Sequence, residues 1–145
     1  MSSFAVLEQG ESLARRLVAR FGPAVDVGRE PELLVLGPGA RGPGRALVCG
    51  TVLLPGSESG LLENIQAKSA VSYGMSGRDT ITLSSREERH MWVAVQRELV
   101  RLDGTVMERQ EFPVYLEQGL DELQVLALTG ALLLHGIQPD ELCKS

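Results

Sequence analysis

The eight residues from Tyr73 to Thr80 (YGMSGRDT) hold the densest set of chemically capable side chains in the chain. A phenol, two hydroxyls, a guanidinium and a carboxylate fall within one short segment that also contains two glycines. The segment follows an apolar run, so we expect it at the carboxyl end of a buried strand, where open α/β sheets bind their ligands. The candidate ligand-binding residues of this turn are Tyr73, Gly74, Ser76, Arg78, Asp79 and Thr80.

Arg78 is the residue of this turn that could hold an anion, because a guanidinium binds a carboxylate or phosphate through two parallel hydrogen bonds. A plainer interpretation is a solvated chain reversal, in which Gly74 and Gly77 only permit the turn. The residues favour the chain reversal, and a small anionic ligand is the alternative.

Residues 37–45 (GPGARGPGR) form a second glycine-rich segment with anion-binding potential. Backbone N–H groups freed by glycine could approach a phosphate, and Arg41 and Arg45 would add positive charge. However, each proline removes one donor, and the spacing fits neither known phosphate-binding glycine motif. We therefore expect a surface loop, with Arg41 kept as a candidate anion contact.

The remaining reactive residues do not form a catalytic or metal-binding pattern. Residues 86–90 (REERH) lack metal-ligand spacing and are typical of a solvated face, while His135 near a helix end is more simply a dipole partner. Cys49 lies in an apolar run and is expected to be a buried free thiol. There is no Gly-x-Ser-x-Gly motif. The sequence therefore predicts no catalytic, metal or cofactor site, and a non-catalytic domain is favoured.

Size and charge narrow the class of protein. The chain has 145 residues, which predicts one domain over residues 1–145, and a net charge of −5. An acidic chain with scattered arginines argues against a nucleic-acid partner. No signal peptide or apolar stretch of bilayer length is recognisable, so we expect a cytoplasmic protein that does not contact a membrane.

The elements that must position the turn show two different patterns of apolar residues. The first part of the chain contains apolar runs typical of strands buried on both faces. Strands are expected at 32–36, 46–54 and 70–73, with a short helix at 61–68. Residues 4–21 are either one helix, with Ser3 as its N-cap, or a short strand at 4–7 followed by a helix from Glu11.

The second part alternates with period two. Residues 80–84 and 91–100 alternate in this way, and the turn at Asp103–Gly104 predicts a hairpin with a partner strand at 106–114. Residues 120–135 form a helix that is apolar on nearly all sides, which predicts a position deep in the core. These elements together predict an α/β fold with three layers, helices on both faces, and a mixed sheet whose parallel strands come first and whose antiparallel hairpin comes late.

Two stretches resemble a known family. VSYGMSGRDTIT (71–82) is similar to a segment late in the central domain of Mur-type ligases, and the helix with its GIQPDEL sequence at 136–142 is similar to the end of that domain. The resemblance covers residues 70–142 and implies a Mur-ligase-like scaffold. It lacks the family's ATP-binding Gly-Lys-[Ser/Thr] motif, and Asp121 and Glu122 stand where the family has a His-Asn pair, so the resemblance implies lost ligase chemistry.

Two functions remain open at this point. The first is a non-catalytic scaffold that acts through protein contacts, above all self-association, with the apolar last helix and the hairpin offering surface to a partner. The second is a small-molecule or nucleotide-binding protein, or an enzyme, that uses the turn at 73–80.

Overall fold

The structure is a computed structural model that describes residues 2–144 and centres on a seven-stranded mixed sheet. Its order is β1-β2-β3-β4-β5-β6-β9. The first five strands are parallel neighbours, and β6 and β9 join antiparallel. The strands are β1 (Phe4–Leu7), β2 (Leu33–Leu36), β3 (Leu47–Pro55), β4 (Ile65–Gly74), β5 (Ile81–Arg86), β6 (His90–Val95) and β9 (Gln110–Tyr115). The predicted α/β class, with parallel strands first, is confirmed.

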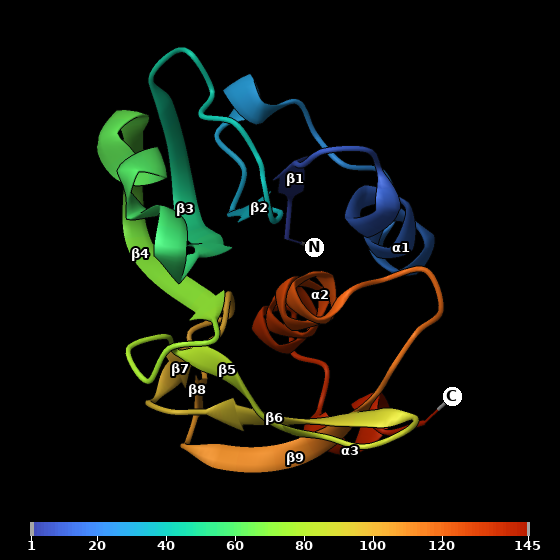
Figure 1. Cartoon of the computed structure of the whole chain (residues 1–145). Coiled ribbons are helices and arrows are strands. Elements are labelled where there is room, and N and C mark those ends of the chain that lie inside the picture. The colour runs from blue at the N-terminus through green and yellow to red at the C-terminus, as the bar shows by residue number, and fades with distance from the viewer. Residues whose placement is uncertain (1, 145) are drawn as a thin grey trace.

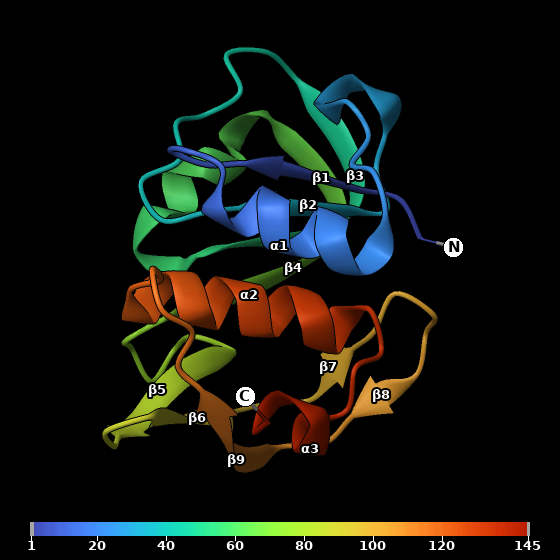
Figure 2. The same cartoon turned by 90° about the vertical axis from the view of Figure 1, so that its right-hand side faces the viewer.

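The sheet curls around one helix, α2 (Glu122–Leu134), which lies between the parallel strands and the antiparallel ones (Figures 1 and 2). Helix α1 (Ser12–Phe21) packs beside it on the same concave side. A short helix, α3 (Pro139–Leu142), packs against β9. The larger core fills this concave side and joins residues from both kinds of strand, such as Leu53 and Val93, to α2.

The convex face of the parallel strands is covered by short 3₁₀ segments and a loop. These are η1 (Val27–Arg29), η2 (Gly56–Asn64) and residues 37–46. Under them lies a second core, which includes Leu34, Cys49 and Leu54. Helical segments therefore lie on both faces, as expected, and the two apolar runs near residues 33 and 46 are neighbouring strands.

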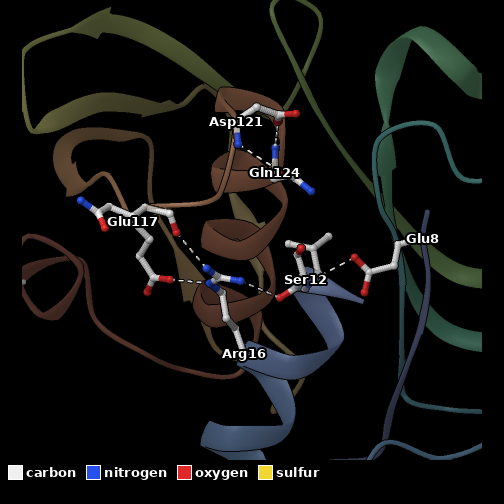
Figure 3. Close-up of polar contacts among 8 residues, drawn as sticks. Glu8, Ser12, Arg16, Glu117, Asp121 and Gln124 are labelled. Atoms are coloured by element: carbon white, nitrogen blue, oxygen red, sulfur yellow. Dashed lines mark hydrogen bonds and ion pairs between the residues drawn. The ribbon is translucent and has the colours of Figure 1, made fainter. Parts of the chain in front are cut away.

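Helix α2 is apolar on nearly all sides because its own chain encloses it. Between Val125 and Leu134 every residue except Leu132 is buried. Its first turn is held by a capping box, in which the Asp121 side chain accepts from Gln124 N and the Gln124 side chain accepts from Asp121 N (Figure 3). The idea that this helix offers a surface to a partner is wrong, since the protomer already covers it. No helix within residues 2–144 is long and apolar enough to cross a bilayer.

The N-terminal segment is a strand followed by a helix, which decides between the two alternatives for residues 4–21. Gly10 takes a positive φ of 82° between them, a conformation that ends the strand and that other residues rarely adopt. The Glu8 carboxylate then accepts hydrogen bonds from Leu13 N and Ala14 N, at 3.0 and 2.8 Å. Figure 3 shows Glu8 beside this first turn. A side chain before the helix thus satisfies free N–H groups of its first turn.

The expected helix at 61–68 is wrong. A 3₁₀ segment ends at Asn64, and Ile65 begins β4, which pairs with β3 from Ile65 to Tyr73. Ile65 and Ala67 pack into the convex core from this strand. The gain from the ladder with β3 outweighs the local helical pattern, a tertiary effect that propensity alone does not include.

The expected long hairpin is interrupted. Residues 90–95 pair with 110–115, whereas β7 (Leu99–Val100) and β8 (Val106–Met107) form a separate two-stranded ribbon around the predicted turn at Asp103–Gly104. The ribbon leaves the sheet because Leu102 N donates to Leu134 O, at the end of α2. The predicted alternation of β6 is observed, and the structure shows that Met91, Val93 and Val95 form its buried side.

Halfway along β3 and β4, the alternation of convex-facing and concave-facing side chains reverses in both strands. In β3, Leu47 and Cys49 face the convex core, and beyond Gly50 the convex residues are Val52 and Leu54, out of phase with the first two. A Cβ atom at Gly50 would lie 2.7 Å from the carbonyl oxygen of Glu32. Only glycine allows this close approach of two backbones, which brings about the local turn of the sheet.

Candidate functional site

The turn at 75–80 lies at a fork in the sheet. Strand β4 pairs with β5 only through Tyr73 with Ile81 and Gly74 with Thr82, so the chain steps sideways at the end of β4 and the two strands then diverge. The fork is also the carboxyl end of β3, which finishes at Pro55. The expected position of the turn, at the carboxyl end of a buried strand, is confirmed.

Polar groups inside the turn fix its shape. Ser76 N donates to Asp79 Oδ2 at 3.1 Å, and Asp79 N donates back to Ser76 O at 3.0 Å. The Gln96 side chain donates to Asp79 O at 2.6 Å, and its backbone N donates to Thr80 O at 2.8 Å. Thr80 N also donates to Ser72 Oγ at 3.3 Å. The turn is therefore held from three sides, by β4, by β6 and by itself.

Asp79 is the buried acid of this site. Only 4 % of its surface is exposed, and its carboxylate lies between two glycines. A Cβ atom at Gly56 would overlap Asp79 Oδ1, and one at Gly74 would lie 2.6 Å from Oδ2. Within residues 2–144, Oδ2 accepts the Ser76 hydrogen bond and Oδ1 accepts none. Both glycines are thus required to seat this carboxylate.

Two cavities open on either side of Asp79. The first, here called the fork cavity, has a volume of about 310 Å³, lies against η2 and is lined by Ser72, Arg78, Thr80 and Arg97 among others. The second, the helix-side cavity, has a volume of about 510 Å³ and is lined by Tyr73, Ser76 and Leu123 of α2 among others. Gly56, Arg78 and Asp79 line both cavities.

The two cavities differ in charge. Two guanidinium groups, those of Arg78 and Arg97, line the fork cavity, and neither forms an ion pair with another described residue. The helix-side cavity has Arg78 as its single lining cation, and burial, together with the carboxylates of Glu58, Asp121 and Glu8, raises the pKa of Tyr73 in its wall far above its usual value. An anion is therefore better accommodated in the fork cavity than beside Tyr73.

The structure separates the predicted site residues by role. Tyr73 is fully buried and its hydroxyl donates to Leu36 O at 2.7 Å, so it stabilises the core and stays protonated near neutral pH. Ser76 and Thr80 hold the turn through the hydrogen bonds described above, and Gly74 seats the Asp79 carboxylate. Arg78 is the one predicted side chain that is exposed and lines both cavities.

Arg41 does not join this site. It is exposed in the loop between β2 and β3 and lines neither cavity, although that loop reaches η2 at Gly42, whose Cβ position lies 3.8 Å from Leu61. The loop lies on the surface of the convex face, as predicted, and Arg41 shares neither cavity with Arg78.

Sequence reasoning missed Gly56, Gln96 and Arg97. Gly56 follows the apolar run of β3 directly, and a glycine at the end of a buried strand was a usable signal for a close approach. Gln96 and Arg97 follow β6, and they were read as the interior of a longer strand. Their contribution depends on the antiparallel register of β5 with β6, which the sequence alone does not set.

The other reactive residues lie apart from the fork. Cys49 is a buried free thiol, as expected, and residues 86–89 are exposed. His135 is the C-cap of α2, but its ring stacks on Phe21 at a centroid distance of 4.0 Å and burial lowers its pKa, so the neutral imidazole replaces the expected charged dipole partner. No group of three potential metal ligands occurs in the described part of the chain.

Fold and site together define an α/β domain with a curled mixed sheet and a cationic cavity where its parallel strands end. Comparison with protein-family models, with curated proteins and with solved structures found no match to this chain.

Proposed function

We propose that this chain is a non-catalytic binding domain that holds a small anionic ligand in the fork cavity. The observation that carries the proposal is the presence of Arg78 and Arg97 on one cavity at the carboxyl end of β3 and β4, neither of them paired with a described acid. Ligands of open α/β sheets bind at this end of the strands.

The chemistry of the cavity favours a carboxylate or phosphate group. Guanidinium groups bind either one through paired, charge-assisted hydrogen bonds. A volume of about 310 Å³ suits a small organic acid or a phosphate ester. Asp79 Oδ1, which has no hydrogen-bond donor among the described residues, would accept from a hydroxyl or amine on the same ligand.

A non-catalytic role is supported by what lines the fork cavity. Among the residues that line it there is no histidine, cysteine or lysine, and the nearby Tyr73 hydroxyl is hydrogen-bonded in the core. The kinship of residues 70–142 with Mur-type ligases, with the scaffold kept and the ligase chemistry lost, stays a prediction.

The test measures binding of inorganic phosphate and of malonate by calorimetry and by thermal shift, at constant ionic strength. We expect both anions to raise the melting temperature, and Arg78→Ala and Arg97→Ala each to weaken binding at least about tenfold, the loss of one charge-assisted contact. Arg109→Ala, an exposed arginine outside the cavity, is the matched control. Absence of binding by either anion, or binding that is unchanged in both cavity variants, would overturn the proposal.

Self-association is a second candidate, and the β7–β8 ribbon favours it. Val100 and Val106 pair directly across the ribbon and are 51 % and 50 % exposed, which makes a small apolar patch. Light scattering over a range of concentrations tests this idea. A dimer that dissociates in the Val100→Thr/Val106→Thr double variant supports it, and a strict monomer at high concentration contradicts it.

A further inference from the structure

Strand β4 leaves most of its backbone unpaired on one side. It pairs with β3 from Ile65 to Tyr73, but β5 joins it only at Tyr73 and Gly74. Outside the strand ladders, the Ile65 N–H donates to Leu62 O where η2 ends, and no other backbone hydrogen bond of the described residues reaches residues 65–72. An internal strand of the sheet therefore presents an open edge over these eight residues, and beyond the Ile65 N–H alternate N–H and C=O groups along it have no backbone partner.

The two outer edges of the sheet are protected in ways that β4 is not. Strand β1 is only four residues long, and Val25 N donates to Phe4 O at 2.8 Å from the outside. Strand β9 contains Pro113, and α3 packs against it. Short length, proline and a covering segment are the usual means of preventing strand addition at an edge.

The free edge of β4 is accessible and long enough for a partner strand. Gln66, Lys68, Ser69 and Ala70 are all exposed. Eight residues exceed the usual length of a strand, about five or six residues, so a full-length strand could pair here. The single charged residue within the edge is Lys68, and a lysine is compatible with pairing to an acidic strand.

Positive charge lies at the middle of this edge and at its carboxyl end. Lys68 lines a cavity of about 430 Å³ together with Arg101, and Arg78 and Arg97 line the fork cavity at the carboxyl end. None of these four cations forms an ion pair with a described residue. Glu32 lines the first cavity too, Glu63 precedes the strand and Asp79 lines the fork cavity, so these four cations outnumber the three acids along an edge of a chain whose net charge is −5.

We propose that residues 65–72 of β4 form a docking edge for an extended acidic peptide segment of a partner protein, which pairs with β4 as an additional strand. Main-chain hydrogen bonds supply the affinity in this mode of recognition, and charges beside the strand select the partner. The inference goes beyond a small anion in the fork cavity, because the pairing itself uses the β4 backbone and Lys68, although Ala70 and Ser72 of the edge also line that cavity and Arg78 and Arg97 would contact either ligand.

The test uses a fluorescein-labelled octapeptide that alternates glutamate with valine, and measures its binding to the full chain by fluorescence anisotropy. We expect saturable binding that weakens at least about fivefold with Lys68→Glu, about the effect of one lost charge contact, and stays unchanged with Arg109→Glu. A second probe is the same peptide N-methylated at alternate residues, which keeps the charge and removes the main-chain donors. Its binding is expected to be lost in one of the two methylation registers.

Hydrogen–deuterium exchange locates the contact. We expect the octapeptide to slow exchange in residues 65–72 and to leave β1 and β9 unchanged. The proposal is overturned if the octapeptide does not bind, if both methylated registers bind as well as the parent, or if protection appears elsewhere. It is also overturned if the free protein is a dimer already protected at 65–72, since a second copy would then occupy the edge.

Discussion

The parallel part of the sheet is buried on both faces and the antiparallel part on one face, although both parts pack against the same helix, α2. Strand β2, in the parallel part, is buried at all four positions, because α1 and α2 cover one face and η1, η2 and a loop cover the other. Strand β6, in the antiparallel part, buries only alternate residues against α2 and leaves Trp92 and Ala94 half-buried. The same chain thus uses two-sided burial where connections cross over the sheet and one-sided burial where hairpins return along it.

The largest expected effect comes from placing a serine on the face that points away from α2, once in each part of the sheet. Val52 of β3 is fully buried and Ala94 of β6 is half-buried, although both point away from α2. Val52→Ser should lower the free energy of unfolding by about 2–4 kcal/mol, because it removes packed methyl groups and buries a hydroxyl. Ala94→Ser should change it by less than about 0.5 kcal/mol. Urea unfolding measures both, and equal losses would contradict two-sided burial of the parallel part.

The next effect concerns the reversal of inward and outward side chains halfway along β3 and β4, in the parallel part. Gly50→Ala should cost about 1–3 kcal/mol of stability, because its new methyl group meets the backbone oxygen of Glu32. Gly60→Ala, in η2, is the matched control, since a Cβ there meets nothing within 4 Å. Thermal unfolding of the two variants compares them, and a neutral Gly50→Ala would show that the sheet can relax at this point.

The third expected effect is a pH dependence of the free energy of unfolding, which arises from His135 at the end of α2. Burial lowers the pKa of His135 below 6.5, with Glu32 opposing the shift weakly, so the unfolded chain takes up a proton more readily than the folded one. Stability is complete above pH 6.5 and falls as the pH drops toward the folded-state pKa, with a slope of at most about 1.4 kcal/mol per pH unit.

Denaturant unfolding between pH 7.5 and 5 measures this slope. In His135→Leu the part of the slope due to this residue should disappear. An equal pH dependence in the wild type and the variant would show that other groups dominate acid destabilisation.

The smallest expected effect is at the surface link between the two parts. Arg16 of α1 pairs with Glu117 at 2.5 Å and donates to Gln118 O at 3.1 Å, in the loop after β9 (Figure 3). Arg16→Ala should cost up to about 1 kcal/mol, because solvent screens a partly exposed pair. Arg15→Ala, whose partner Glu11 lies on the same segment, should cost less. No loss of stability for Arg16→Ala would show that the link between the parts contributes nothing, and an equal loss for Arg15→Ala would show that it contributes no more than a local ion pair.

The sequence predicted the burial of elements better than their lengths. Continuous apolar runs located β2 and β3, and the all-round apolar pattern located α2, because burial leaves a direct mark on residue type. The start of β4 was not visible, since Ile65–Ala70 carries three polar residues and gains its strand conformation from pairing with β3. The break between β6 and β7 was missed because it depends on Leu102 N bonding to the end of α2.

The candidate site was predictable only in part, for a similar reason. The turn at 73–80 was found because reactive residues gather there within eight positions. Gly56 follows β3 and Arg97 follows β6, and only the pairing of β3 with β4 and of β5 with β6 brings them to the cavity beside Asp79. Local sequence carries information about a turn, and the sheet register decides which distant side chains share its cavity.

The helix at the centre of the molecule also follows every strand of the sheet in the sequence, so it is synthesised after all of them. While the ribosome is still adding residues before 122, strands β1 to β5 already exist but have nothing to fill their concave side. Folding units generally complete only when their contacts are available, so this nascent chain must wait with apolar side chains uncovered. The segment that covers the apolar side chains of the strands is thus made after them. A chain that terminates before α2 therefore leaves its whole concave core uncovered, which is a greater loss than the number of missing residues suggests.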